Sequence, residues 1–366
     1  MGDEYQTVTA AAVQAAPVFL DREASVEKAV GLIEEAGAND ADVIAFPEGF
    51  IPAHPLWFHF HGATSQLSQS LSVELFKNSI EVPGPSTERL AAAADAADAY
   101  VVIGACEKEP QTTGTMYNSQ LFFSPDGELL GTHQKLKPTV GEQLVHTEGE
   151  NDTFGTIDTE YGPMSGLICG ENSNPLAVFG LTAEYSRIHA MSWPPYIPSE
   201  SNPLPERSLD DAKAFAQMSK AAVISSVGVV DERTVEKLQV DDETAEKIMR
   251  PEYSGGSAIV GADRSVIAGP VGNEETILYG DIDIETAIRR KLFHDFAGHY
   301  NRPDVFQLRV NRTPNELYAE ASTAAEAADT GQPPATETES GTTDGIGRDA
   351  GSELVREAVT EDHSEE

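Results

Sequence analysis

Apolar and polar positions follow two different periods along the first third of the chain. Short apolar runs, typical of buried strands, occur as TVTAAAVQAA, DVIAFPE and YVVIGACE. Between them, Val26, Ala29 and Ile33 lie on one face of a predicted helix that follows Asp21, a favoured N-cap residue. A second helix is predicted over residues 87–97. This alternation of strand and helix indicates a layered α/β fold.

The middle of the chain repeats the same rhythm. YNSQLFFSPDGELLGTHQKLKP predicts two strands joined by a turn at Pro125, Asp126 and Gly127. The strand MSGLIC is followed by a turn and by a helix that starts near Pro175, a residue suited to the first helical turn. Strand, helix and strand then recur as IHAMS, LDDAKAFAQMSKA and AVISSVGVV, and a last strand is TILYGDID. We expect two similar halves whose sheets stack face to face.

The composition changes near Tyr318, where large apolar residues become rare and Ala, Thr, Glu, Gly and Asp dominate. Such a segment cannot bury enough apolar surface to offset the entropy of ordering. The sequence therefore predicts one folded domain over residues 5–312 and a disordered acidic tail over residues 318–366.

The charge balance is strongly acidic. Among 366 residues, 61 are Asp or Glu and 24 are Lys or Arg, which gives a formal net charge of −37. This excess disfavours nucleic acid and anionic membrane surfaces as partners. We interpret it as adaptation to concentrated salt, a halophilic property, because salt screens the repulsion between like charges.

The chain has two cysteines, Cys106 and Cys169, and both lie in apolar segments that read as strands. Two such cysteines do not form a disulfide framework, and a reducing compartment fits better. The first residues lack the basic start and apolar run of a signal peptide, and no segment is long and apolar enough to cross a membrane. We therefore expect a soluble, cytoplasmic protein.

Three side chains with catalytic potential lie at predicted strand ends. Cys169 lies between a strand and a helix, where helix N–H groups would lower the pKa of its thiol. Glu48 and Lys135 also end strands, and in layered α/β folds ligands and catalytic groups gather at such ends. A buried cysteine is more often an apolar filler, which is our interpretation of Cys106.

The segments around these residues resemble a known family. FPEGFIPAHPLWF contains Glu48, HQKLKPTVGEQLVH contains Lys135 and Glu142, and GLICGENSNPL contains Cys169. In this order they resemble the three catalytic blocks of the nitrilase family. IHAMSWPPY and DFAGHYNRPDVFQL are similar to two further blocks of the nitrilase branch, so the resemblance covers residues 8–310.

The resemblance implies a four-layer α-β-β-α sandwich and the hydrolysis of an organic nitrile to a carboxylic acid and ammonia. In this interpretation Cys169 is the nucleophile, Glu48 the general base and Lys135 the stabiliser of the tetrahedral intermediate, while Glu142 orients Lys135. Expected substrate-binding residues are Trp57, Glu171, Asn172 and Trp193. The resemblance implies no cofactor and no metal, a small nitrile or amide as substrate, and a homodimer or larger homo-oligomer.

The sequence departs from many nitrilases at three positions, which leaves the substrate open. Gln143 stands where Arg is common, while His146 and Gly170 stand where Trp is common. Amide hydrolysis, cyanide or nitrile hydration that stops at the amide, and a non-catalytic assembly protein are the alternatives. We interpret the His54, His59 and His61 cluster as packing or pocket lining, because it lacks Cys and clustered Asp.

Overall fold

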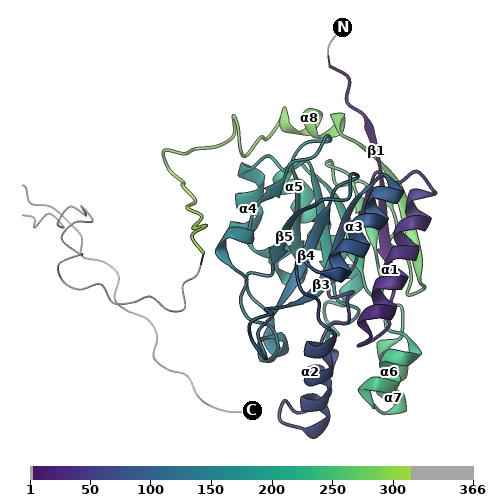
Figure 1. Ribbon diagram of the computed structural model, residues 1–366. Helices are drawn as coiled ribbons and strands as arrows, with labels where there is room; N and C mark the ends of the chain where they lie inside the picture. Colours follow the sequence, from purple (N-terminus) through teal and green to yellow (C-terminus); the bar gives the residue numbers. More distant parts are fainter. Residues whose placement is uncertain (1–2, 315–366) are drawn as a thin grey trace, which may run out of the picture. The chain divides into compact units, whose positions relative to one another are not determined.

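The computed structural model describes residues 3–314. Two six-stranded mixed sheets pack face to face between two outer layers of helices, with α1 and α3 on one side and α4 and α5 on the other (Figure 1). This arrangement confirms the predicted four-layer sandwich. The expected tail over residues 318–366 lies outside the described residues.

Each sheet has the same plan, with three parallel strands and antiparallel strands at its edges. In spatial order the first sheet contains β12 (Thr276–Asp283), β1 (Thr7–Gln14), β2 (Val43–Ala45), β3 (Tyr100–Lys108), β4 (Met116–Phe123) and β5 (Leu129–Gln134). The second contains β11 (Val266–Ala268), β10 (Ala258–Val260), β9 (Ala222–Val227), β8 (Ile188–Trp193), β7 (Met164–Ile168) and β6 (Thr156–Ile157).

Eight α-helices and four short 3-10 turns lie between and after the strands in residues 3–314. The helices are α1 (Arg22–Gly37), α2 (Gln66–Asn78), α3 (Pro85–Ala97), α4 (Pro175–Ala183), α5 (Leu204–Ser219), α6 (Glu232–Leu238), α7 (Asp242–Ile248) and α8 (Glu285–Lys291). Short 3-10 turns are η1 (Leu56–His59), η2 (Val140–Leu144), η3 (Asn151–Thr153) and η4 (Cys169–Ser173). Within residues 3–314, none of these helices has both the length and the apolarity that a membrane span requires.

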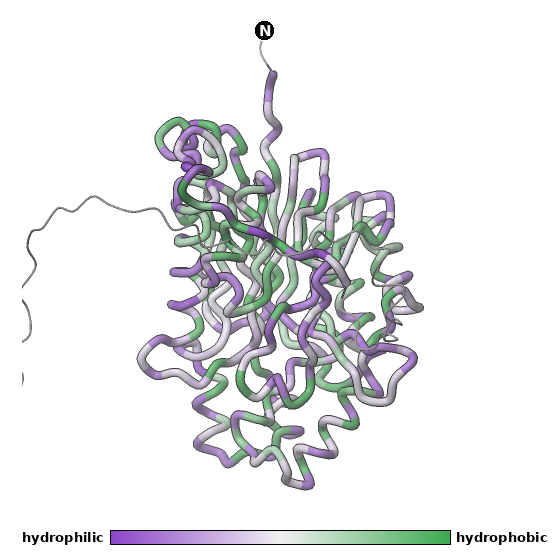
Figure 2. Tube along the Cα trace, turned by 90° about the vertical axis from the view of Figure 1, so that its left-hand side faces the viewer, coloured by the Kyte–Doolittle hydropathy of each residue, from purple (hydrophilic) through white to green (hydrophobic). Residues whose placement is uncertain are grey.

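The alternation of side chains along β1 explains the layers. Val8 and Ala10 point toward the second sheet and are packed in a cluster with Ile224 of β9. Ala11 and Val13 point the other way, into a separate cluster with α1 and α3. A third apolar cluster fills the space between the second sheet and α4 and α5. Hydrophilic stretches lie mostly on the outer loops and helix surfaces (Figure 2).

Several predicted elements form at the expected positions. The helix after Asp21 is α1, and the Asp21 carboxylate caps it by accepting a hydrogen bond from Ala24 N at 3.1 Å. The predicted helix over 87–97 begins two residues earlier, at Pro85. Sequence patterns missed α2, α6, α7 and α8. The helix α2 buries only Ser68, Leu71 and Leu75, so its apolar stripe is too narrow to stand out along the chain.

Candidate active site

Strand directions bring three functional side chains to one edge of the sandwich. Glu48 follows β2, Cys169 follows β7, and Lys135 follows β5, which is antiparallel to β4 and therefore runs in the same direction as β3. Glu48 is held across the sheets, since its backbone N–H donates to Trp193 O of β8 at 3.1 Å. Carboxyl ends of strands in the two sheets thus converge on a single site.

Glycine at position 104 allows the backbone before Glu48 to lie against β3. A Cβ atom at Gly104 would lie 2.2 Å from Pro47 O and 2.9 Å from Glu48 Cα. Both contacts are to backbone atoms, which cannot move aside as the tip of a flexible side chain can. The position of the Glu48 carboxylate therefore depends on the absence of a side chain at residue 104.

Lys135 lies between two carboxylates. Its Nζ donates to Glu48 Oε1 at 2.8 Å and to Glu142 Oε2 at 2.5 Å. The Asn118 amide Nδ2 donates to Glu48 Oε1 at 2.7 Å and to Glu142 Oε1 at 2.8 Å, so it joins the same two acids. Asn118 O also accepts the backbone N–H of Lys135 at 2.8 Å. Asn118 of β4 therefore contacts all three charged residues and fixes their relative positions.

Burial and pairing separate the protonation states of the two acids. Burial raises the pKa of Glu48 to about 7, against the lowering effect of Lys135. Burial also disfavours the charge on Glu142, but Lys135 and His146 hold the pKa of this carboxyl well below its usual range. For Lys135, two nearby carboxylates outweigh burial, and the pKa of the ammonium lies well above normal. The site therefore contains one poised acid beside a fixed ion pair.

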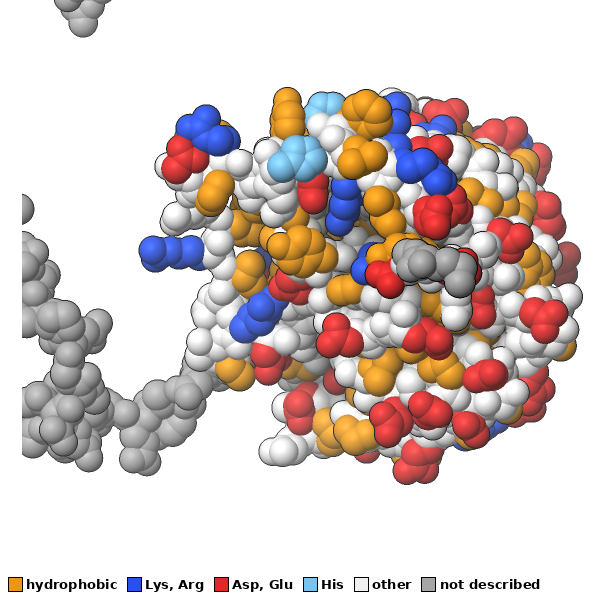
Figure 3. Space-filling model, turned by 90° about the horizontal axis from the view of Figure 1, so that it is seen from above, with side chains coloured by type: hydrophobic (Ala, Val, Ile, Leu, Met, Phe, Trp, Pro, Cys, Tyr) orange, Lys and Arg blue, Asp and Glu red, His pale blue; other side chains and the backbone are white. Residues whose placement is uncertain are grey.

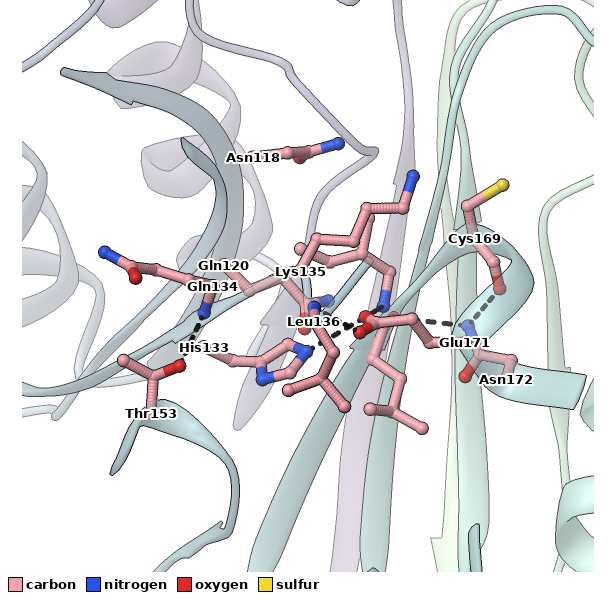
Figure 4. Close-up of polar contacts among 12 residues, drawn as sticks. Asn118, Gln120, His133, Gln134, Lys135, Leu136, Thr153, Cys169, Glu171 and Asn172 are labelled. Carbon is pink, nitrogen blue, oxygen red and sulfur yellow. Dashed lines mark hydrogen bonds and ion pairs between the residues drawn. The ribbon is translucent and has the colours of Figure 1, made fainter. Parts of the chain in front are cut away.

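Cys169 has a left-handed backbone with φ of 53°, an unusual conformation for a residue with a side chain. This sharp turn between β7 and η4, the Cys169 elbow, is held by hydrogen bonds on both sides. Asn172 Nδ2 donates to Cys169 O at 2.9 Å, and Glu171 Oε2 accepts from Ile168 N at 2.9 Å. Figure 4 shows the sulfur of Cys169 and the ammonium of Lys135 pointing to the same side of the elbow.

The expectation of a lowered thiol pKa is wrong. Burial raises the pKa of Cys169, the Glu48 carboxylate raises it further, and Lys135 offsets only part of the effect. The regular helix starts at Pro175, beyond the 3-10 turn that contains Cys169, so the thiol does not lie in the first turn of α4. The Cys169 thiol is therefore protonated at rest, and its pKa lies above that of the Glu48 carboxyl.

Residues 9–291 match the family described as carbon-nitrogen hydrolase. The chain belongs to this family.

Relatives named as nitrilases and as a cyanide hydratase align with most of the chain. The chain is 36% identical over 310 residues to Nitrilase 2 of an unknown prokaryotic organism, covering 85% of this chain and 94% of that protein. It is 34% identical over 311 residues to the nitrilase of Bacillus sp. strain OxB-1, covering 84% and 89%. A cyanide hydratase of Stereum hirsutum is 33% identical over 321 residues, with 85% of each chain covered.

Solved structures agree with the fold. The carbon-nitrogen hydrolase of Helicobacter pylori G27 superimposes with a TM-score of 0.62 at 19% identity and covers 82% of this chain and 97% of its own. Nit3 of Saccharomyces cerevisiae has the same TM-score at 21% identity, with coverage of 79% and 94%. At these identities the likeness concerns the fold alone.

In this carbon-nitrogen hydrolase, the side chains of Glu171 and Asn172 form hydrogen bonds with other residues of the chain. The Glu171 carboxylate accepts from Leu136 N at 2.7 Å and lies 3.0 Å from His133 Nε2, in addition to its bond with Ile168 (Figure 4). Asn172 Oδ1 lies 2.9 Å from His189 Nε2. These hydrogen bonds hold the backbone around Cys169, and the expected role of the two side chains in substrate binding stays a prediction.

The two tryptophans expected to bind substrate are fully buried. Trp57 packs against Phe19, with ring centroids 6.5 Å apart, and belongs to a separate apolar cluster. Trp193 packs in the same cluster as Cys169, under the guanidinium of Arg207. Neither ring offers an exposed face, and both pack in apolar clusters, so their expected role in substrate binding stays a prediction.

Two buried histidines flank the carboxylates of the hydrolase site. His54 Nδ1 lies 3.6 Å from Glu48 Oε1, and His146 Nδ1 lies 3.6 Å from Glu142 Oε1. Burial lowers the pKa of His54 to about 3, so this ring is neutral. Among the described residues, Glu48, His54 and Glu142 offer metal-ligand atoms within 4.8 Å of one another. The Lys135 ammonium already bridges both carboxylates, which disfavours a second cation there.

Sequence reasoning missed Asn118 as a site residue. A signal was present, because Asn118 and Gln120 are polar residues at a spacing of two in the apolar strand YNSQLFF. Both side chains point toward the second sheet, where Gln120 Nε2 donates to Ser192 Oγ at 2.7 Å. Buried amides at this spacing indicate a polar connection between layers rather than ordinary strand packing.

Proposed function

We propose that this carbon-nitrogen hydrolase converts an organic nitrile to its carboxylic acid and ammonia, with Cys169 as the nucleophile. The observation that supports it most directly is the buried ion pair of Lys135 with Glu48 and Glu142 beside the Cys169 elbow. The nitrilase names of relatives 33–36% identical to this chain favour nitriles over other carbon-nitrogen substrates.

The first step uses the poised carboxylate. Because the thiol of Cys169 is protonated at rest, attack on the nitrile carbon requires a base, and the unpartnered Glu48 Oε2 is available to take the proton. The sulfur–carbon bond forms as one nitrile π bond breaks, and the negative charge develops on nitrogen. Lys135 stabilises that charge and passes the proton taken up by Glu48 to the nitrogen, which produces a neutral thioimidate and returns Glu48 to its carboxylate form.

Two water molecules complete the reaction. Glu48 removes a proton from the first water, which adds to the thioimidate carbon, and the tetrahedral intermediate expels ammonia to leave a thioester. The second water hydrolyses the thioester and releases the carboxylic acid and the Cys169 thiol. In this scheme Glu142 keeps Lys135 charged and oriented, since its carboxylate pairs with Nζ on the side opposite Glu48. No step requires a metal or an organic cofactor.

The experiment measures ammonia and organic products from an aliphatic and an aromatic nitrile. We expect acid and ammonia in equal amounts, and we expect Cys169→Ala to lower kcat by more than about 10³-fold, as removal of a nucleophile does. Cys106→Ala is the matched control, because Cys106 is buried in β3 and donates only to Ala53 O. Accumulated amide would indicate a hydratase, and undiminished turnover by Cys169→Ala would contradict the nucleophile.

We also propose a homodimer or larger homo-oligomer that works in a reducing, salt-rich cytoplasm. A groove of about 730 Å³ between α4 and residues 296–308 supports association of two copies, because Leu176 and Phe306 beside it are 64% and 71% exposed. Phe306→Glu should shift the mass measured by light scattering toward the monomer, while Val73→Glu on α2 should leave it unchanged. An unchanged mass for Phe306→Glu would remove this face from the interface.

A further inference from the structure

A cavity of about 200 Å³ lies at the end of the sandwich away from the candidate active site. Arg187 directly precedes β8 and Lys220 lies just before β9, whereas Cys169 follows the carboxyl end of the parallel strand β7. One length of strand, roughly 15–20 Å at about 3.3 Å per residue, therefore separates this cavity from the nucleophile.

The cavity is lined by three cations and no acid. Arg187, Lys220 and Lys291 contribute to its wall, and the remaining wall is apolar or hydroxyl-bearing, including Ile284 and Ser186. In a chain with 61 acidic and 24 basic residues, three bases around one small cavity is an unexpected arrangement. Figure 3, which views the molecule from the end that carries α8 in Figure 1, shows Lys and Arg side chains gathered over one part of this face.

These cations lack carboxylate partners among the described residues, although most other bases there form ion pairs. Arg187 and Lys291 lie over the rings of Tyr5 and Tyr185 instead, at 5.6 and 5.7 Å from the ring centres. Aromatic faces attract cations but supply no full counter-charge. Arg187 Nη1 also donates to Tyr161 O at 3.3 Å, and the Lys220 ammonium lies 5.3 Å from the ring centre of Phe296. Within residues 3–314 the three cations thus have neutral partners and no carboxylate counter-charge.

Lys220 makes the clearest case, because its side chain is almost completely buried, with 2% of its surface exposed. Its ammonium donates to Gln217 O at the end of α5, which supplies the partial negative charge of a helix terminus. A buried ammonium without a counter-ion is costly. Burial and the nearby Arg290 and Arg264 lower the pKa of Lys220, and a bound anion would act in the opposite direction by favouring its charged form.

We propose that this cavity binds a small polyvalent oxyanion, of the phosphate or short dicarboxylate class, held by Arg187, Lys220 and Lys291. The volume of about 200 Å³ is below the roughly 300–1,000 Å³ typical of sites for drug-sized ligands, which fits an anion of a few heavy atoms. Arg187 supplies a planar fork suited to two oxygens, and the two lysines supply point charges. The site does not depend on the proposed nitrile hydrolysis.

Calorimetric titration of the full-length protein with inorganic phosphate, at constant ionic strength, tests the site. We expect one phosphate for each chain and at least tenfold weaker binding in Lys220→Gln and in Lys291→Gln. Lys213→Gln is the matched control, since Lys213 lies on α5, carries the same charge and does not line the cavity. A second titration with succinate distinguishes the two anion sources, and saturation by either supports the proposal.

Two results would overturn the proposal. The first is a titration without saturable heat for both phosphate and succinate. The second is equal weakening by Lys213→Gln and by the cavity variants, which would indicate general attraction to positive charge. Thermal unfolding of each variant identifies folding defects, and Lys291→Gln keeps the test valid if Lys220→Gln fails to fold, because Lys291 lies on the outer helix α8.

Discussion

The side chain of Asn118 determines how the charges of the candidate site are shared. Its amide donates to one oxygen of Glu48 and one of Glu142, and both bonds favour the ionised form of the acid that accepts them. Lys135 acts in the same direction, while burial and the repulsion between the two acids act against ionisation of Glu48. The result is a carboxyl with a pKa of about 7, close to the value that suits a general base at neutral pH.

Turnover should fall as the pH decreases through 7, because protonated Glu48 cannot accept the thiol proton. The value of kcat/KM should drop about tenfold for each pH unit on this acid limb. Asn118→Leu removes the N–H donor that favours the charged form of Glu48, so the pKa of Glu48 should rise and the limb should move to higher pH by about one unit.

The measurement is the pH profile of kcat/KM from ammonia release. Ser119→Ala is the control, because Ser119 bonds to Glu107 from the neighbouring position in β4 and contacts neither Glu48 nor Glu142. A profile of Asn118→Leu that overlays the unaltered protein would show that Asn118 does not set the ionisation of Glu48.

Among the elements, β3 controls the candidate site without contributing a side chain to it. The strand lies beneath the turn that follows β2, and only a residue without Cβ allows the contact at Gly104. Across the sheets, Ser192 Oγ of β8 donates to Phe46 O at 2.8 Å, which holds the same turn from the other side. Glu48 is therefore positioned by two strands from different halves of the chain.

Gly104→Ala should displace Glu48 and reduce both stability and turnover. The added methyl group would contact Pro47 O at 2.2 Å, and overpacking of this kind costs about 1–3 kcal/mol in the free energy of unfolding. We expect kcat to fall at least about tenfold, measured by ammonia release beside urea unfolding. Gly114→Ala is the control, since no atom lies within 4 Å of a Cβ at that position. Full activity of Gly104→Ala would contradict the positioning role of β3.

The whole molecule carries a formal charge of −37, and much of the basic complement lies in surface ion pairs such as Lys28 with Glu275 and Lys247 with Glu200. Such exposed pairs contribute little individually, so the excess acids repel one another at low salt. The Debye length falls from about 10 Å at 0.1 M to about 3 Å at 1 M, which removes most of that repulsion.

The midpoint of thermal unfolding should therefore rise with salt, by about 5 °C or more between 0.1 M and 2 M KCl. Calorimetric scans measure this shift, and sucrose at equal osmolality serves as an uncharged control for general exclusion from the protein surface. A midpoint that responds equally to KCl and sucrose would count against charge screening and against the halophilic interpretation.

The chain's local patterns were sufficient for most strands, for the helices α1, α3, α4 and α5, and for the positions of Glu48, Lys135 and Cys169 at the ends of strands. Apolar runs and turn residues act over a few positions, so they are visible in the sequence itself. The four-layer arrangement was predicted from the resemblance to a family, and the packing of the three apolar clusters confirms it.

Only the tertiary structure decided how those residues behave. The thiol pKa of Cys169 is raised rather than lowered, because burial and a carboxylate from another strand outweigh the effect of a nearby helix. Asn118 and Gly104 acquire their roles from segments 70 and about 56 residues away along the chain. Burial, charge pairing and close backbone contact depend on such distant neighbours, and a linear pattern does not contain the distances between them.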